Sequence, residues 1–222
     1  MYMKKYLAEA LGTFVLVLFG TGVAVVSGGN LVATSLAFGL AIIASAYGVA
    51  SISGCHVNPA VSLAMLIDGR LNAKDFFGYV VGQVAGAFCG TGILCLILNT
   101  TAYGTSNLGA NSFSSMTLLS AGAVEVILAF VFVYVILTVT KDESKSNIAP
   151  LIIGLTLAFV HLLGINLTGT SVNPARSLAP AIFMCGEALK QVWVFIVFPL
   201  IGGAFAALTF KCLTPTTKKG RK

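Results

Sequence analysis

Charged residues are scarce in this chain of 222 residues, and their scarcity excludes most classes of protein. Only 9% of the residues are charged, whereas a soluble globular domain carries about 25%. Stretches without any charged residue run over 10–67, 76–124, 126–140 and 146–175. A helix needs roughly 20 apolar residues to cross a bilayer. The stretches therefore predict several membrane spans and exclude a soluble fold.

Metal-ligand and disulfide patterns are also missing. The five cysteines have neither metal-site spacing nor the pattern of a disulfide framework: Cys55, Cys89, Cys95, Cys185 and Cys212. The sequence offers no nucleophile–base pair or metal-ligand cluster, so we expect no enzyme activity, no bound metal and no cofactor. The first apolar stretch lacks a typical cleavage site, which predicts a retained span rather than a signal peptide.

The net charge of +6 does not indicate a nucleic-acid partner, because the basic residues are placed as in a membrane protein. Four of them form a tail after Pro215: Lys218, Lys219, Arg221 and Lys222. Such a tail is typical of a solvated cytoplasmic end beside anionic lipid. We therefore expect the lipid bilayer, and no nucleic acid, as the surroundings of this chain.

Six segments are long enough to span a bilayer, and two shorter apolar segments are not. The six are predicted over about 6–27, 33–53, 76–98, 116–140, 148–167 and 191–211. The short segments, about 59–67 and 174–185, cannot cross alone at roughly 1.5 Å per residue. We therefore predict an all-α membrane protein with six transmembrane helices and two re-entrant half-helices.

The distribution of Lys and Arg predicts the orientation of these spans. With the N-terminus in the cytoplasm, the outer connections contain only Lys190, and those around 28–32 and 99–115 contain no basic residue. This asymmetry follows the positive-inside rule. We expect a multi-pass protein of the cell membrane, the inner membrane if bacterial, with both termini in the cytoplasm.

An internal repeat is the strongest signal in the sequence. Residues 57–64, Val-Asn-Pro-Ala-Val-Ser-Leu-Ala, recur at 172–179 with seven of eight positions identical and an offset of 115 residues. A unit of three spans and one half-helix has an odd number of spans, so the second copy must be inverted, as in many transport proteins. We predict one domain over 1–222, with repeats at about 1–110 and 115–213 and a basic tail at 214–222.

Each half-helix is expected to begin at an Asn-Pro-Ala motif. Asn favours the N-cap and Pro the first helical position. Each helix N-terminus carries about half a positive charge, so two facing N-termini disfavour cations and protons but not water. Each Asn carboxamide can also donate a hydrogen bond to a passing oxygen. The two motifs are Asn58, Pro59 and Ala60, and Asn173, Pro174 and Ala175.

With these motifs the chain resembles the aquaporin, or major intrinsic protein, family over essentially its whole length. The resemblance is carried by 8–14 (Ala-Glu-Ala-Leu-Gly-Thr-Phe), 53–60 (Ser-Gly-Cys-His-Val-Asn-Pro-Ala) and 170–177 (Thr-Ser-Val-Asn-Pro-Ala-Arg-Ser). It implies six spans with two half-helices, a pore within each protomer and usually a homotetramer. The chain looks most similar to the bacterial water channels of the family.

The one difference between the repeated octapeptides, Val61 against Arg176, points to a selective constriction. A membrane-embedded arginine needs a wet cavity or partners, so we expect Arg176 to line a pore. The resemblance implies that Phe38, His161 and Thr170 complete this filter. Phe38 is then an apolar wall, His161 and Arg176 are donors, and the carbonyl or hydroxyl of Thr170 accepts. From the residues alone, His161 could equally pack between helices, and Arg176 could bond loop carbonyls.

Four further residues are expected near the re-entrant loops. Glu9 and Glu125, 116 residues apart, are interpreted as structural groups that bond loop backbone, with a proton relay as the alternative. His56 is expected to do the same on the cytoplasmic side. Cys55, three residues before Asn58, is a possible mercurial site if it faces the pore.

These features predict a passive channel for water that excludes protons and ions. Glycerol-conducting relatives typically have a small residue in place of the filter histidine and Asp after the arginine, whereas this chain has His161 and Ser177. A facilitator of glycerol or other small neutral solutes is the alternative. An ion-coupled transporter would need cation-coordinating groups at the midplane, where Asn58 and Asn173 offer donors instead.

Overall fold

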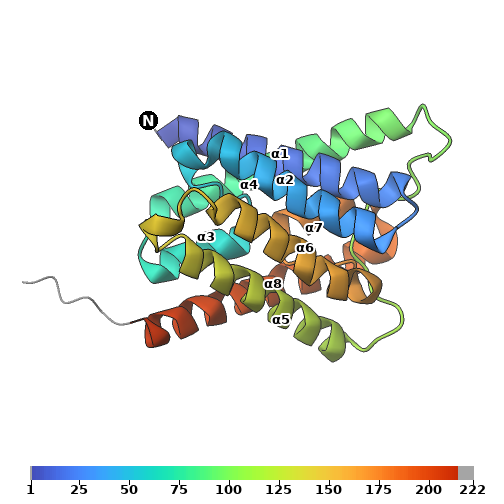
Figure 1. Cartoon of the computed structure of the whole chain (residues 1–222). Coiled ribbons are helices and arrows are strands. Elements are labelled where there is room, and N and C mark those ends of the chain that lie inside the picture. The colour runs from blue at the N-terminus through green and yellow to red at the C-terminus, as the bar shows by residue number, and fades with distance from the viewer. Residues whose placement is uncertain (1, 215–222) are drawn as a thin grey trace, which may run out of the picture.

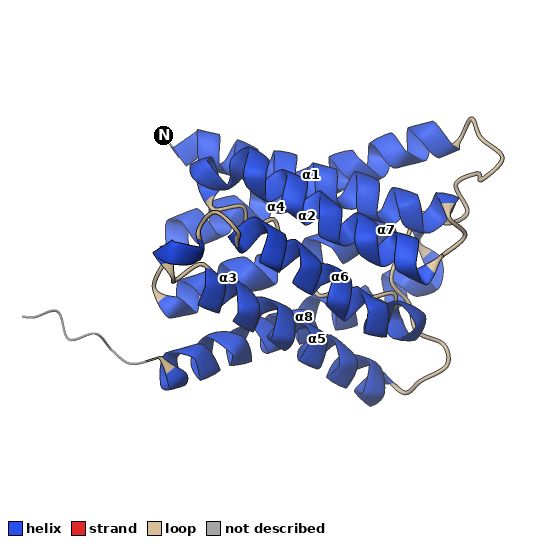
Figure 2. Ribbon diagram, viewed as in Figure 1, coloured by secondary structure: helices blue, strands red, loops and turns tan. Residues whose placement is uncertain are grey.

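The computed structural model describes residues 2–214, and of Glu143 only the backbone (Figure 1). Apart from Thr214, the predicted basic tail lies outside the described residues. Within 2–214 there are eight α-helices, one short 3-10 helix and no strand (Figure 2). The elements are α1 Tyr2–Val26, α2 Leu31–Ser53, α3 Pro59–Asp68, α4 Ala73–Leu98, α5 Leu118–Val139, η1 Glu143–Lys145, α6 Ala149–Thr168, α7 Pro174–Met184 and α8 Gly186–Leu213.

The predicted division into six long and two short apolar helices is confirmed. Helices α1, α2, α4, α5, α6 and α8 are long and apolar enough to cross a membrane, whereas α3 has 10 residues and α7 has 11. Helices α1 and α8 begin four or five residues before the predicted spans, because their first turns are polar and extend beyond the apolar stretch. The start of α1 and the end of α8 lie at the same end of the bundle (Figure 1).

The helices pack in two equivalent sets. Helix α1 packs on α2 and α4, and α5 packs on α6 and α8 in the same way, while α2 and α6 join the two sets. Each half-helix also reaches the other set, because α3 packs on α8 and α7 packs on α4. The arrangement is the one expected for two inverted copies of a three-span unit.

Glycines make the closest of these contacts possible. A Cβ on Gly86 of α4 would collide with the carbonyl oxygen of Ala10 in α1, and a Cβ on Gly202 of α8 would collide with that of Val126 in α5. Gly39 and Gly154 meet where α2 crosses α6. The glycines at 78, 82, 86 and 90 of α4 form a close-packing surface, because a Cβ at each would press on α1.

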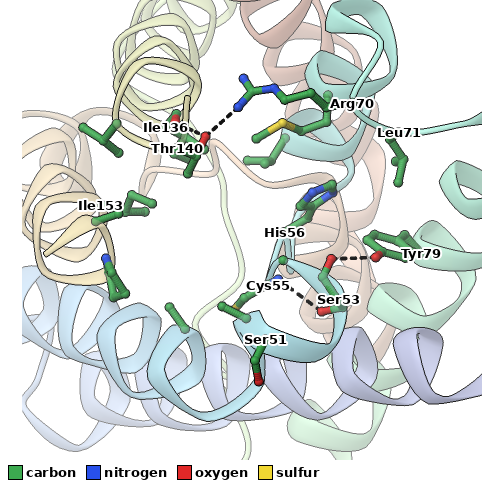
Figure 3. A pocket seen from close by; sticks show the side chains of 18 of the residues that line it. Ser51, Ser53, Cys55, His56, Arg70, Leu71, Tyr79, Ile136, Thr140 and Ile153 are labelled. Carbon is green, nitrogen blue, oxygen red and sulfur yellow. Dashed lines mark hydrogen bonds between the residues drawn. The ribbon is translucent and has the colours of Figure 1, made fainter. Parts of the chain in front are cut away.

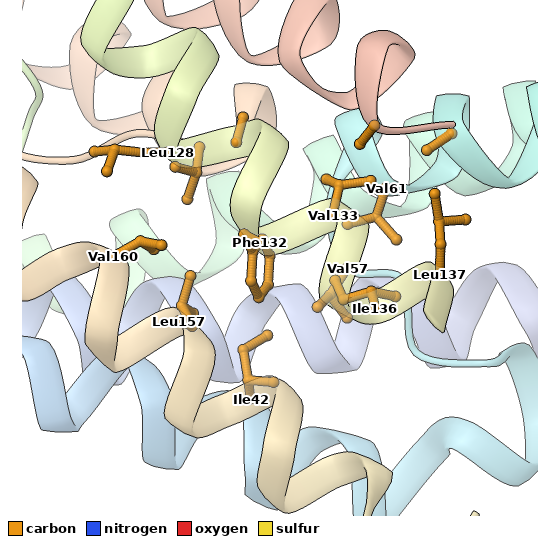
Figure 4. Packing of buried hydrophobic residues seen from close by; sticks show 14 of the residues in the cluster. Ile42, Val57, Val61, Leu128, Phe132, Val133, Ile136, Leu137, Leu157 and Val160 are labelled. Carbon is orange, nitrogen blue, oxygen red and sulfur yellow. The ribbon is translucent and has the colours of Figure 1, made fainter. Parts of the chain in front are cut away.

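Apolar side chains fill the contacts between helices and also cover the outer surface. The main core cluster lies around Phe132, Leu157 and Ile42, where α5, α6 and α2 approach one another (Figure 4). Large apolar residues such as Leu119 and Val81 are 79% and 70% exposed, while Glu9 and Glu125 are fully buried. This distribution, apolar outside and partly polar inside, is that of a protein surrounded by lipid.

Substituting Gly86 with Ala should destabilise the bundle, because the added methyl group meets backbone that cannot move aside. Overpacking of this kind costs roughly 1–3 kcal/mol, and thermal unfolding of the purified protein in detergent should show a lower Tm. Gly48→Ala is the matched control, since nothing lies within 4 Å of its Cβ position. Equal Tm values for the two variants would contradict the assigned α1–α4 contact.

Candidate functional site

The two half-helices meet through their N-terminal asparagines. Asn58 caps α3 by accepting a hydrogen bond from the N–H of Ala60 at 2.8 Å, and Asn173 caps α7 by accepting from Ala175 and Arg176. The amide of Asn58 donates across the centre to the carbonyl of Val172 at 2.7 Å, and that of Asn173 donates to Val57 at 2.8 Å. These crossed bonds fix the two N-termini against each other.

The loops that precede the half-helices have an unusual backbone. Val57 and Val172 have φ values of 45° and 46°, and Cys55 and Thr170 have 54° and 48°. This left-handed region is unfavourable for a β-branched residue. The strain is therefore the same in both repeats, and it persists only because surrounding groups fix the loops.

Two buried carboxylates provide that support, as expected from the sequence. Glu9 accepts hydrogen bonds from the backbone N–H groups of His56 and Val57 at 2.9 and 2.6 Å. Glu125 accepts from those of Ser171 and Val172, both at 2.9 Å. A hydroxyl at the end of the preceding helix completes each set, Ser53 for Glu9 and Thr168 for Glu125. Both carboxylates serve the loop backbone, which favours the structural interpretation over a proton relay.

Behind each loop, a side-chain contact links it to the half-helix that follows. His56 was expected to bond backbone, but its Nδ1 instead pairs with Oγ of Ser62 at 3.1 Å. In the other repeat Ser171 pairs with Ser177 at 2.6 Å. Gln83, which the sequence analysis missed, donates to both Glu9 and Ser62 and is fully buried. Its only sequence signal is an amide within an otherwise apolar span.

The two capping asparagines and three of the residues predicted to form the filter line one narrow cavity. Its walls include Asn58, Asn173, Phe38, His161 and Arg176, and its volume is about 10 Å³, close to the smallest space that admits one water molecule. The remaining lining is mostly apolar: Leu16, Ile42, Phe132, Leu157 and Val172 with His56 and Ser171. A molecule in this space therefore meets a few polar groups on an apolar background.

Three of the lining side chains lie against one another. The rings of Phe38 and His161 stack with centroids 4.4 Å apart, and Cζ of Arg176 lies 4.9 Å from the Phe38 centroid. Nδ1 of His161 lies 2.9 Å from the carbonyl oxygen of Leu157 and must carry the hydrogen, since a carbonyl only accepts. In the neutral ring Nε2 is therefore an acceptor, whereas the sequence analysis expected a donor. A protonated His161 ring would carry a positive charge, which the guanidinium of Arg176 would repel.

Thr170 lies next to this cavity but not in its lining. Its hydroxyl is directed to Gly164 of α6, where a Cβ would collide with it, and it has no hydrogen-bond partner among the described residues. The cavity lining instead includes the next two residues, Ser171 and Val172.

The loop between α4 and α5 contributes residues that sequence reasoning missed. Arg176 donates to the carbonyl of Gly109 and to the side chain of Asn111 at 2.8 and 2.7 Å. Asn111 is 1% exposed. No repeat, spacing or charge in this loop singles Asn111 out, because its role depends on a contact 65 residues along the chain.

On the side of the loop that precedes α3, the narrow cavity adjoins a wide cavity of about 680 Å³. Figure 3 shows Cys55, His56, Arg70, Thr140 and Ile153 around its open centre. His56 lines both cavities. Cys55 lines the wide one and is half-buried. The two cavities together form a funnel that narrows toward the asparagines.

Removing either buried carboxylate should disrupt the protein. Glu9→Ala or Glu125→Ala leaves two loop N–H groups without an acceptor, and each buried unsatisfied group costs about 1–3 kcal/mol. We expect a large loss of Tm, or aggregation in size-exclusion chromatography, for both variants. Glu187→Ala is the control, because its ion pair with Lys190 is exposed and worth about 0–1 kcal/mol. Full stability of the Glu9 and Glu125 variants would refute the supporting role.

Comparison with known proteins identifies the family that has this architecture. The family model described as "Major intrinsic protein" matches residues 1–210. Glycerol uptake facilitator protein-like 6 of Lactiplantibacillus plantarum is 45% identical over 206 residues, which cover 92% of this chain and 95% of that relative. Aquaporin Z of Rhodopseudomonas palustris is 40% identical over 228 residues, which cover 97% of this chain and 95% of the relative.

The fold is likewise similar to that of a solved structure. The aquaglyceroporin from Plasmodium falciparum matches with a TM-score of 0.86 at 24% identity, covering 96% of this chain and 97% of that one. At this identity the likeness concerns the fold alone. The family match and the two sequence relatives show that this chain belongs to the major intrinsic protein family of membrane channels.

Proposed function

We propose that the chain is a passive water channel that excludes protons and ions, with its pore inside each protomer. The observation that carries the proposal is the narrow cavity, in which Asn58 and Asn173 share one passage with Phe38, His161 and Arg176. Its size suits molecules in single file. Its polar side chains can form hydrogen bonds with a small neutral molecule, and the rest of its lining is mostly apolar.

Exclusion of cations follows from the charges that face the passage. The N-termini of α3 and α7 meet at its centre, and each carries about half a positive charge. Arg176 adds a full positive charge at the constriction, and among residues 2–214 no carboxylate lines this cavity. A cation that gave up its water here would receive little compensation.

Water is proposed over polyols because Phe38, His161 and Arg176 crowd the same section of the cavity. Facilitation of glycerol or other small neutral solutes is the second candidate. It is favoured by the relative named as a glycerol uptake facilitator-like protein, which is 45% identical.

We further propose that the chain is one domain of two inverted repeats. We also propose that it forms a homotetramer and lies in the cell membrane with both termini in the cytoplasm.

Stopped-flow light scattering of proteoliposomes separates the two solutes. Under a sucrose gradient the vesicles should shrink much faster than protein-free vesicles, and under a glycerol gradient they should re-swell no faster than those controls. His161→Gly should raise glycerol entry by roughly tenfold, since it removes one wall of the filter. Rapid re-swelling with the unaltered chain would instead support the glycerol facilitator.

Cys55 gives an independent test of the route on the wide side. Because Cys55 lines the funnel, a mercurial should slow water flux several-fold in the unaltered chain, and Cys55→Ser should abolish most of this inhibition. The exposed Cys89 and Cys212 serve as controls through Cys89→Ser and Cys212→Ser. Undiminished inhibition of the Cys55→Ser variant would place Cys55 off the permeation path.

A further inference from the structure

The position of the Arg176 guanidinium depends on the loop between α4 and α5. Its Nη1 donates to the Gly109 carbonyl and to Oδ1 of Asn111, while its Nε has no partner among the described residues. Both bonds come from the segment between α4 and α5. This segment therefore sets where the guanidinium lies beside Phe38.

The Asn111 amide is oriented by its other contacts. Its Nδ2 donates to the carbonyl of Thr168 at the end of α6 at 3.1 Å, and its Oδ1 also accepts from Oγ of Ser177 at 2.8 Å. A carbonyl only accepts and a guanidinium only donates, so one orientation of the amide alone satisfies both. The amide is thus fixed with its acceptor toward Arg176.

The surroundings of Asn111 are shaped to hold it there. Gly169 has a φ of +72°, and a Cβ at this position would come within 3.0 Å of the Asn111 amide nitrogen. Two residues further along, both backbone groups of Phe113 bond the side chain of Gln191 at 2.9 and 3.0 Å. Gly109 lies against Thr21 of α1. The loop is therefore anchored on both sides of Asn111.

We infer that Asn111 is a positioning residue for selectivity, which holds the Arg176 guanidinium so that the constriction stays too narrow for three-carbon polyols. This inference rests on the proposed function. Without the Asn111 acceptor, the guanidinium keeps one loop bond and can leave the wall it now occupies. Loss of a hydrogen bond to a charged group changes such a population on the order of tenfold or more.

The test is the ratio of glycerol to water permeability in proteoliposomes of the full chain. Asn111→Ala should raise this ratio at least about fivefold, because displaced arginine positions widen the filter. Asn111→Asp loses the donor to Thr168 but keeps the acceptor for Arg176 and Ser177, and it should retain most of the selectivity. Asn99→Ala is the matched control in the same loop, since this asparagine is exposed. An unchanged ratio for folded Asn111→Ala would overturn the inference.

A double-mutant cycle separates positioning from a general loss of structure. In an Arg176→Val background, Asn111→Ala should leave the ratio unchanged, because Asn111 acts through the arginine. An equal increase in both backgrounds would contradict this. If Asn111→Ala does not fold, Asn111→Ser replaces it, since the shorter side chain cannot reach Arg176 and Thr168 together. The ratio of the unaltered chain tests the proposed water selectivity, whereas only the changes on substitution test Asn111.

Discussion

The crossed hydrogen bonds between the two re-entrant loops are the contact on which the rest of the interior depends. Each asparagine uses its oxygen to cap its own half-helix and its nitrogen to bond the opposite loop. The two half-helices can therefore begin in the middle of the membrane while the asparagine oxygens accept hydrogen bonds from their first backbone N–H groups. Irregular backbone at that depth is tolerated only where it is buried in protein or lines a cavity, and here it does both.

The strain of this arrangement is distributed equally over the two repeats. Val57 and Val172 take the same left-handed conformation, and Glu9 and Glu125 accept the N–H groups that this conformation turns inward. The long helices then hold the carboxylates through glycine contacts that are also repeated, at Gly86 and Gly202. The two repeats build the passage symmetrically, and one departure from the symmetry is the charge of Arg176, which stands where the first repeat has Val61.

Much of the fold could be predicted from the sequence, because its signals are local or repeated. Apolar length gave the spans, and Asn-Pro-Ala gave the half-helix starts at Pro59 and Pro174, where the structure has them. Contacts made by a single residue over a long distance were not predictable. Asn111 lies in a loop without a pattern, Gln83 has no counterpart in the second repeat, and the His161 tautomer depends on its contact with the Leu157 carbonyl.

We propose that the two facing helix N-termini, with Arg176 beyond them, let neutral water pass and reject positive charge. Proton influx into proteoliposomes that contain a trapped pH dye tests this directly, with the membrane potential clamped by potassium and valinomycin. We expect rapid osmotic shrinkage together with proton influx no faster than in protein-free vesicles. Proton influx that rises in proportion to the protein content would contradict it.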